Sequence, residues 1–293
     1  MKDRALNSMG KVAIVTDSIA CLTKEMAEQY KIRIVPANIC SGGEVFRDWV
    51  DISPSEAYEL FLKAPEHCIT STASPAEYLQ VYRELSSQAE SILCVTISSK
   101  LSTMNGIAQV AREQAKEEFP RTTIEILDSQ TCAAAEGFVA LAAARAAKEG
   151  EALVEVIEKA KEVRGKVALV ALLNTVRYIH RTGRIPKVAA RAASILNIRP
   201  IFTIFGDDIH FAGIVRSRKH GVERILEVMK KKAGQNPVHV AVMHAYALDE
   251  AQKLRDRVSS EFNPVELWIA EFSPVMGYAC GTGVLGLAFY SDS

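Results

Sequence analysis

Four clusters of hydroxyl and carboxyl side chains follow apolar segments of the chain. The third cluster follows the β-branched run 92–97 and precedes a helical pattern, so it is predicted to lie where a buried strand ends and a helix begins. Free backbone N–H groups and the positive end of a helix dipole meet at such a junction, which therefore suits an anion. If all four clusters share one edge of a parallel sheet, they favour a common polar ligand. The clusters are Thr16-Asp17-Ser18, Thr70-Ser71-Thr72, Ser98-Ser99-Lys100-Leu101-Ser102-Thr103 and Asp128-Ser129.

The same residues have a simpler interpretation as helix caps. Asp, Ser and Thr are preferred at the first positions of helices, and turns from strand to helix need such caps. Taken singly, Asp17 or Asp128 is therefore better explained by capping than by catalysis. The argument for a ligand depends on the four clusters being brought together.

Other patterns exclude several classes of chemistry. The segment 281–286 fits GxGxxG, but only seven residues follow it, so we expect a glycine-rich bend before a terminal strand. His239 and His244 are an odd number of residues apart on a predicted strand and point to opposite faces, so no metal site is expected. Neither a GxSxG elbow nor a P-loop is present. Basic and acidic residues balance at 35 each, which gives no global field for nucleic acid.

The elements that must position these clusters alternate between strand and helix in the first half. An alternation of this kind predicts a parallel α/β sheet. Ser53 and Ser74 each begin a capping box with proline at the first helical position. The predicted strands are 11–15, 32–35, 92–97 and 123–127, and the predicted helices are 22–30, 54–62, 75–90, 107–115, 133–148 and 152–163.

The second half combines hairpin and crossover connections, which predicts a mixed sheet. Gly206-Asp207-Asp208 separates two apolar runs and is typical of a hairpin. The predicted strands are 167–172, 200–205, 209–215, 238–243, 265–271 and 284–289, and the predicted helices are 174–181, 188–196, 219–232 and 248–262.

At 293 residues the chain is long enough for two domains, which we place at 1–165 and 166–293. The six cysteines are at least 19 residues apart, as expected for reduced, mostly buried thiols in a cytoplasmic protein. The first residues lack the apolar core of a signal peptide, and no apolar run approaches the roughly 20 residues of a transmembrane helix.

Taken in order, the motifs of this chain resemble those of the DegV family from about residue 11 to residue 290. The resemblance implies a two-domain α/β protein that encloses one long-chain fatty acid, with the tail in an apolar tunnel and the carboxylate between the domains. The motifs that carry it are Thr16-Asp17-Ser18, Thr70-Ser71, Ile97-Ser98-Ser99-Lys100-Leu101-Ser102, Asp128-Ser129, Arg181-Thr182-Gly183-Arg184-Ile185, Ile198-Arg199-Pro200-Ile201 and Gly281-Thr282-Gly283.

The resemblance also implies partners and site residues. Bacterial members are lipid-binding subunits of fatty-acid kinases, in which a separate dihydroxyacetone-kinase-like, ATP-binding subunit makes acyl phosphate for phospholipid synthesis. The hydroxyls that bind the carboxylate correspond to Thr70 and Ser102, with Ser71 and Thr103 beside them. No cofactor or metal is implied, and transient contact with a membrane is compatible with such a carrier.

Further positions concern the head group and the partner. Arg184 and Arg216 correspond to arginines near the head group and the kinase-docking face. Ala279, followed by Cys280, stands where the family usually has a histidine near the carboxylate, just before the glycine turn. The loss of that histidine is compatible with binding, and it bears on the hand-over to a kinase or on the identity of the ligand.

Two other functions stay open on the residues alone. A small-molecule enzyme could use the same hydroxyl cluster on a phosphorylated metabolite, and it would need a polar, wet cleft. A lipid sensor could bind the same ligand without a kinase partner.

Overall fold

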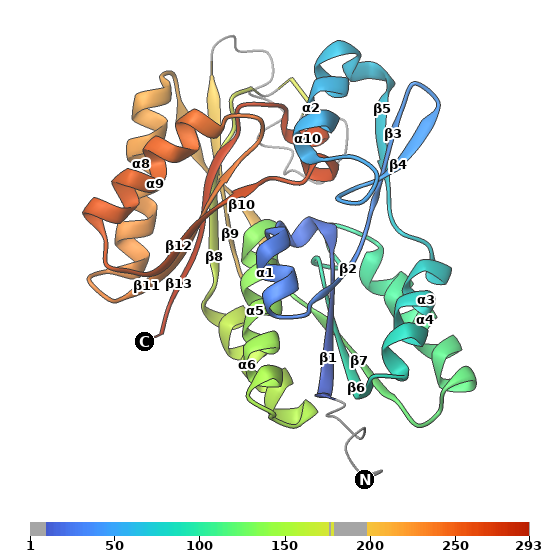
Figure 1. The fold of residues 1–293 in the computed structure, drawn as a ribbon. Helices are drawn as coiled ribbons and strands as arrows, with labels where there is room; N and C mark the ends of the chain where they lie inside the picture. Colours follow the sequence, from blue (N-terminus) through green and yellow to red (C-terminus); the bar gives the residue numbers. More distant parts are fainter. Residues whose placement is uncertain (1–9, 176, 179–197, 293) are drawn as a thin grey trace.

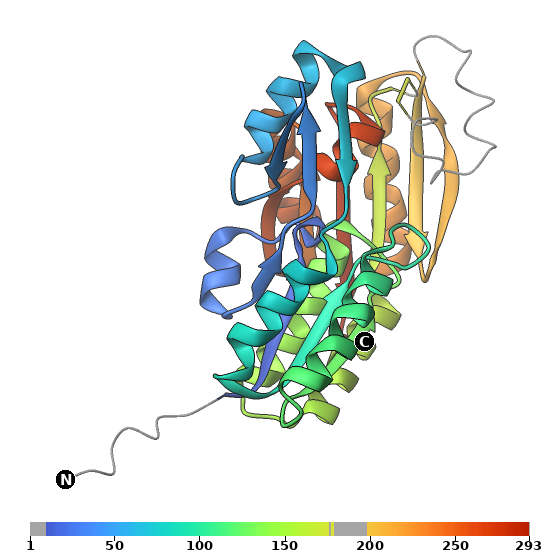
Figure 2. The ribbon, with the colours of Figure 1, turned by 90° about the vertical axis from the view of Figure 1, so that its right-hand side faces the viewer.

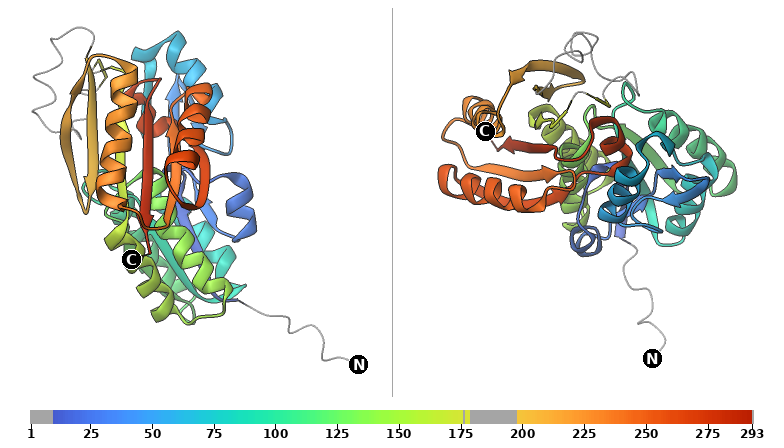
Figure 3. Two further views of the ribbon diagram at one scale, coloured as in Figure 1. Left: turned by 90° about the vertical axis from the view of Figure 1, so that its left-hand side faces the viewer. Right: turned by 90° about the horizontal axis from the view of Figure 1, so that it is seen from above.

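A computed structural model describes residues 10–175, 177–178 and 198–292. The described elements form layers in which helices alternate with two sheets (Figure 1). Helices α3 and α4 cover the outer face of the first sheet, α5 and α6 lie between the two sheets, and α8 and α9 cover the outer face of the second. Figure 3 shows α8 and α9 side by side on that outer face.

The first sheet is parallel and has the strand order β2-β1-β6-β7. Strand β6 is buried on both faces, as its continuous apolar sequence requires. The helices that cover this sheet begin close to the predicted positions, although α3 ends at Ser86 rather than near Glu90. The prediction of a parallel α/β first half is confirmed. The strands are β1 (Gly10–Asp17), β2 (Arg33–Val35), β6 (Ala89–Thr96) and β7 (Thr123–Asp128), and the helices are α1 (Lys24–Gln29), α3 (Pro75–Ser86), α4 (Met104–Glu118), α5 (Ala133–Lys148) and α6 (Leu153–Lys166).

The second sheet has the order β10-β9-β8-β13-β11-β12. Strands β11 and β12 pair in parallel and the other neighbours are antiparallel, so the predicted mixed sheet is confirmed. The predicted hairpin joins β9 and β10 at Gly206-Asp207. The elements are β8 (Ala168–Leu172), β9 (Arg199–Phe205), β10 (Asp208–Val215), α8 (Arg218–Ala233), β11 (Val238–His244), α9 (Leu248–Glu261), β12 (Pro264–Glu271) and β13 (Leu285–Ser291).

Helix α5 lies at the centre of the molecule. Its alanine-rich sequence presents small side chains all around, which lets sheets pack closely on it, and nearly all of it is buried. Phe138 on α5 makes edge contacts with Trp268 and Tyr290 of the second sheet, at ring distances of 4.5 and 5.0 Å. One hydrophobic core therefore runs from the first sheet through α5 to the second. The division of the chain at residue 165 stays a prediction, and it falls at the end of α6.

A small antiparallel sheet, with the order β4-β3-β5, adds a third region that the sequence did not predict. It packs with α2 (Pro54–Lys63) and with α10 (Pro274–Cys280), which comes from the far end of the chain (Figure 1). The polar cluster at 70–72, expected to follow a strand, instead begins inside one, because Thr70 and Ser71 end β5. The strands are β3 (Asn38–Ser41), β4 (Glu44–Arg47) and β5 (Cys68–Ser71).

Some of the predicted features cannot be compared with the structure. Half of the predicted helix 174–181, all of the predicted helix 188–196 and Arg184 lie outside the described residues. None of the six cysteines forms a disulfide, and four of them are buried, as expected. Among the helices that the structure describes, none combines the length and the apolar character needed to cross a bilayer.

Candidate functional site

Three of the four polar clusters meet at the carboxyl edge of the first sheet. Asp17, at the end of β1, accepts hydrogen bonds at both carboxyl oxygens, from the backbone N–H groups of Ile19 and Ile97 at 3.0 Å each. Asp128, at the end of β7, likewise accepts from Gln130 N at 2.8 Å and Ser99 N at 3.1 Å. Asp17 is thus the N-cap of the short helical turn Ser18–Ala20, as the capping interpretation predicts. Asp128 caps no helix, because the N-cap of α5 is Cys132, and it instead ties the end of β7 to two turns.

The remaining cluster, Thr70-Ser71-Thr72, lies elsewhere, so the prediction that all four clusters share this edge is wrong. Thr70 and Ser71 belong to β5 of the small antiparallel sheet, because the preceding apolar segment pairs with β3 rather than with a parallel strand. A ligand bound by all four clusters would therefore have to contact two different sheets.

Glu136, an acid that the sequence analysis did not single out, lies close to Asp17 behind the carboxyl edge of the first sheet. Burial raises the pKa of Asp17 to about 6, although its two backbone donors oppose the shift. Burial, and then the nearby Asp17, raise the pKa of Glu136 on α5 well above its ordinary value. The Thr16 hydroxyl donates to Glu136 Oε1 at 3.3 Å. Both acids therefore hold a proton more readily than they do in water. The sequence feature that could have revealed this pair is Glu136 itself, a single acid near the start of an alanine-rich helix.

Strand β5 distinguishes between the two hydroxyl candidates that it carries. Thr70 is paired with Ile39 of β3, so their side chains share one face of the small sheet. Ile39 is fully buried in the core that this sheet shares with α2 and α10, and Thr70 is half-buried beside it. Ser71 points to the opposite face and is exposed. Thr70 is thus the better placed of the two.

Helix α10 packs against β5 and brings Ala279 and Cys280 to the same region. Both residues lie half-buried in its last turn. Burial raises the pKa of the Cys280 thiol to about 12, so it is neutral at pH 7. The helix ends at the predicted glycine bend, where Gly281 and Gly283 have φ values of 79° and 80°, a backbone region that favours glycine.

The start of α10 is held by buried polar contacts with the first part of the chain. The Ser273 hydroxyl, at the helix N-cap, donates to Asp48 Oδ2 at 2.7 Å, and Ser273 N donates to Cys21 Sγ at 3.3 Å. The Tyr58 hydroxyl donates to the carbonyl oxygen of Phe272 at 2.6 Å. Gly277 has no side chain where the Tyr58 ring packs, and a Cβ atom there would overlap the ring. We call these contacts the α10 junction.

Ser102 and Thr103 lie just before α4. Ser102 is half-buried, and its Oγ accepts a hydrogen bond from Met104 N at 3.3 Å, so it closes the first turn of the helix. Among the described residues no acceptor takes up its O–H group, which remains available to a ligand. Thr103 is exposed and makes no capping bond with its side chain.

Partly buried apolar side chains pack on the main core just before α4, on β10 and on α10. Leu101 precedes Ser102, Ile209 and Phe211 line one side of β10, and Met276 lies on α10. All of them pack on the main core while part of their surface stays accessible. An acyl chain lying across such surfaces would remove them from water.

Two arginines, Arg216 and Arg218, lie just after β10. Arg216 follows β10 and is exposed, and its carbonyl oxygen accepts from Arg199 at 2.9 Å. Arg218, two residues on, donates to the carbonyl oxygen of Gly283 at 2.6 Å and pairs with Glu250. Arg218 thus supports the glycine bend, a role that the sequence did not indicate.

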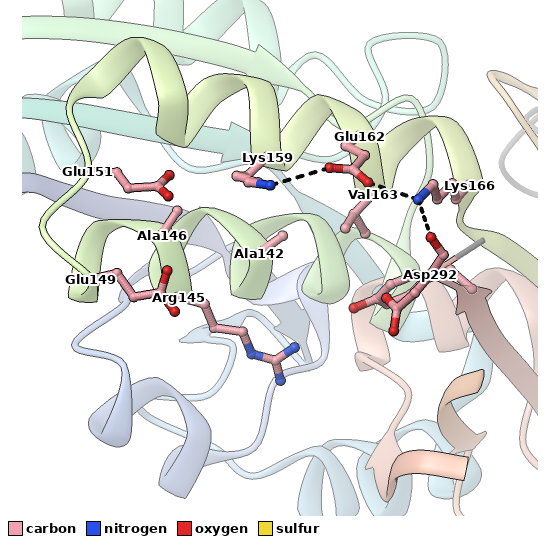
Figure 4. Close-up of a pocket in the computed structure, with 11 residues that line it drawn as sticks. Ala142, Arg145, Ala146, Glu149, Glu151, Lys159, Glu162, Val163, Lys166 and Asp292 are labelled. Atoms are coloured by element: carbon pink, nitrogen blue, oxygen red, sulfur yellow. Dashed lines mark hydrogen bonds and ion pairs between the residues drawn. The ribbon is translucent and has the colours of Figure 1, made fainter. Parts of the chain in front are cut away.

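A hollow of about 250 Å³ lies elsewhere, between α5, α6 and the end of β13 (Figure 4). Its walls are mostly charged, and Lys166 pairs with Glu162 at 2.8 Å and donates to the carbonyl oxygen of Asp292 at 2.9 Å. None of the predicted site residues lines it. Charged walls are unsuited to an acyl chain.

Comparison with known proteins gives consistent similarities at the level of family, sequence and fold. The family model described as "Uncharacterised protein, DegV family" matches residues 11–292. A DegV domain-containing protein of Streptomyces coelicolor is 31% identical over 283 residues, covering 96% of this chain and 98% of the relative.

Two solved structures have the same fold. The crystal structure of DegV of Bacillus subtilis, a fatty acid binding protein, superposes with a TM-score of 0.87 at 27% identity and covers 96% of this chain and 99% of that one. A stearic acid-binding protein of Eubacterium ventriosum gives a TM-score of 0.89 at 26% identity, covering 96% and 98%.

Proposed function

This chain belongs to the DegV family, and we propose that it binds one long-chain fatty acid whose carboxylate is received by Thr70 and Ser102. The observation that carries the proposal is the side-chain arrangement at β5. Thr70 faces the core shared with α10, whereas its neighbour Ser71 faces solvent. Leu101, next to Ser102 in the chain, and Met276, on the same helix as Cys280, are partly buried apolar residues that pack on the main core. Related proteins with this fold bind fatty acids.

The two ends of a fatty acid need different surroundings. Each buried methylene contributes about 0.8 kcal/mol, so a tail of about fifteen contributes roughly 12 kcal/mol before the costs of association. The carboxylate needs partners once it leaves water, and a hydrogen bond to a charged acceptor is worth about 1.5–3 kcal/mol. The tail therefore supplies most of the affinity, while Thr70 and Ser102 orient the head group.

Matched variants test this assignment. Thr70→Ala and Ser102→Ala should each weaken binding of oleate about ten- to a hundredfold, since each removes one donor to a charged acceptor. Ser71→Ala and Thr103→Ala, which change adjacent exposed hydroxyls, should leave binding unchanged. Dissociation constants for oleate would be measured by fluorescence competition.

A second measurement asks whether a lipid is bound at all. Denaturing mass spectrometry of lipid extracted from protein produced in bacteria should detect an acyl chain at about one per protein. No acyl chain, together with no uptake of added oleate or palmitate, would refute the proposal. An enzyme acting on a phosphorylated metabolite through the same hydroxyls is the alternative, and it would turn over its substrate without a partner subunit.

The bound carboxylate is presented to a separate, dihydroxyacetone-kinase-like subunit. A carboxylate oxygen attacks the γ-phosphorus of ATP, ADP leaves, and acyl phosphate forms, so this chain needs no complete active site of its own. Neutral hydroxyls suit this role because they hold the carboxylate without a bidentate arginine clamp. The exposed Arg216 belongs to the docking face in this scheme.

The kinase step has its own test. With the ATP-binding subunit added, hydroxylamine trapping should detect acyl phosphate, and Arg216→Ala should reduce its yield without changing oleate affinity. Ala279→His should increase the yield, since it restores the residue usual in the family. Binding without any acyl phosphate, even in Ala279→His, would favour a lipid sensor instead.

A further inference from the structure

One group of side chains links the loop that carries Ser102 to the second sheet. The Ser98 hydroxyl donates to Asp207 Oδ1 at 2.7 Å. Lys100 Nζ lies 3.0 Å from Asp207 Oδ2 and 2.9 Å from Asp208 Oδ1. Asp207 and Asp208 are at the turn between β9 and β10, and Figure 2 shows the loop after β6 reaching that turn. The contact joins residues more than a hundred positions apart.

We propose that Ser98, Lys100, Asp207 and Asp208 form a clasp that closes the fatty-acid site, and that its opening limits release of the ligand. Asp207 is the central positioning residue, because its two carboxyl oxygens hold the two loop residues separately. The inference rests on the proposed function and names how the same site opens.

The neighbours of the clasp explain why it would control a ligand. Leu101 and Ser102 follow Lys100 directly, and Ile209 follows Asp208. Leu101 and Ile209 are among the half-buried apolar side chains on the main core. Separating the loop from the β9–β10 turn would therefore expose apolar surface and move the hydroxyl of Ser102 at the same time.

The clasp is more exposed to water than the α10 junction, the other group of contacts that holds the proposed site together. The side chains of Lys100 and Asp208 are 53% and 66% exposed, so water and salt compete with their ion pair. At the α10 junction, by contrast, Asp48 is 1% and Ser273 3% exposed. Local opening occurs where few buried contacts must be broken. The site is thus expected to open at the loop while α10 stays in place.

Stopped-flow release of cis-parinaric acid into an excess of phosphatidylcholine vesicles tests the clasp. Asp207→Ala should raise the dissociation rate about tenfold, since it removes a charge-assisted hydrogen bond and an ion pair. Lys100→Gln should raise it two- to threefold. Glu118→Gln is the matched control, because it breaks an equally exposed pair, Arg83–Glu118, that joins α3 to α4 without touching the second sheet.

Salt provides a readout that a purely structural role would not give. Raising sodium chloride from about 0.05 M to about 0.5 M should speed release from the wild type and from Glu118→Gln, but hardly from Lys100→Gln, which has lost the screened pair. Equal rates for the wild type, Asp207→Ala and Lys100→Gln would overturn the clasp and leave fatty-acid binding standing. A wild type that takes up no cis-parinaric acid, oleate or palmitate would instead refute the proposed function, and the clasp with it.

Discussion

The α10 junction and the clasp attach two parts of one proposed site, but they do so by different interactions. The junction uses buried hydrogen bonds and ring packing around Tyr58 and Asp48, which water does not reach. The clasp uses the two ion pairs of Lys100, which are in contact with solvent, and one buried hydroxyl, that of Ser98. Buried polar groups are costly to separate, whereas exposed ion pairs contribute little. The difference indicates a fixed wall on one side and an opening side on the other.

The largest effect is expected from Gly277→Ala at the junction. Its new Cβ atom would overlap the Tyr58 ring, so α10 or Tyr58 must move. Overpacking of this kind costs about 1–3 kcal/mol or more, and oleate binding should fall with it. Gly106→Ala on α4 is the control, since nothing lies within 4 Å of the added atom, and it should stabilise the protein by up to about 1 kcal/mol. Urea unfolding measures both, and equal effects would contradict the close packing.

The junction should also depend on pH, because burial raises the pKa of Asp48 to about 6 from an ordinary value of 3.8. A raised pKa means that the stability linked to this group is complete below about pH 4 and is lost as the pH rises through 6. Each pKa unit corresponds to about 1.4 kcal/mol, so the loss approaches about 3 kcal/mol.

Asp48→Asn cannot ionise, so its free energy of unfolding should fall less between pH 4 and pH 7 than that of the wild type. Chemical denaturation at several pH values provides the comparison. Asp17 and Glu136 titrate in the same direction, and they supply the remaining slope in the variant. Parallel pH profiles for the two proteins would show that Asp48 is not buried as described.

A smaller effect is expected when only one hydrogen bond of the junction is removed. Tyr58→Phe leaves the carbonyl oxygen of Phe272 without its donor in a buried place and should cost about 1–3 kcal/mol. Tyr246→Phe removes an exposed hydroxyl that contacts Glu59 at 3.3 Å and should cost less than about 0.5 kcal/mol. Thermal unfolding of the two variants distinguishes them, and a similar loss in both would mean that Tyr58 does not anchor α10.

The sequence predicted elements that depend on local patterns better than it predicted contacts between distant segments. Local signals worked well: both capping boxes formed at Ser53 and Ser74, and the alanine-rich helix occupies the residues expected. The small sheet was missed because β3, β4 and β5 have four residues each, too few to show a period. Helix α10 has seven residues and was missed for the same reason.

The site depended on contacts between distant segments, which no local pattern contains. Choosing Thr70 over Ser71 required knowing that Ile39 lies opposite Thr70. Likewise, Ser98 and Asp207 each have an ordinary local explanation, as a turn hydroxyl and a hairpin residue. Only the fold shows that one donates to the other.

The smallest effect on stability is expected at the clasp, and it sharpens the comparison most. Lys100→Gln removes the solvent-exposed ion pairs and should lower the free energy of unfolding less than Tyr58→Phe does. In the double variant with Tyr58→Phe the two losses should add, since the contacts share no residue. Urea unfolding of the single and double variants measures this, with Glu118→Gln as the matched control. A coupling well above about 0.5 kcal/mol would show that the junction and the clasp open together, and the picture of one fixed wall and one opening side would have to be abandoned.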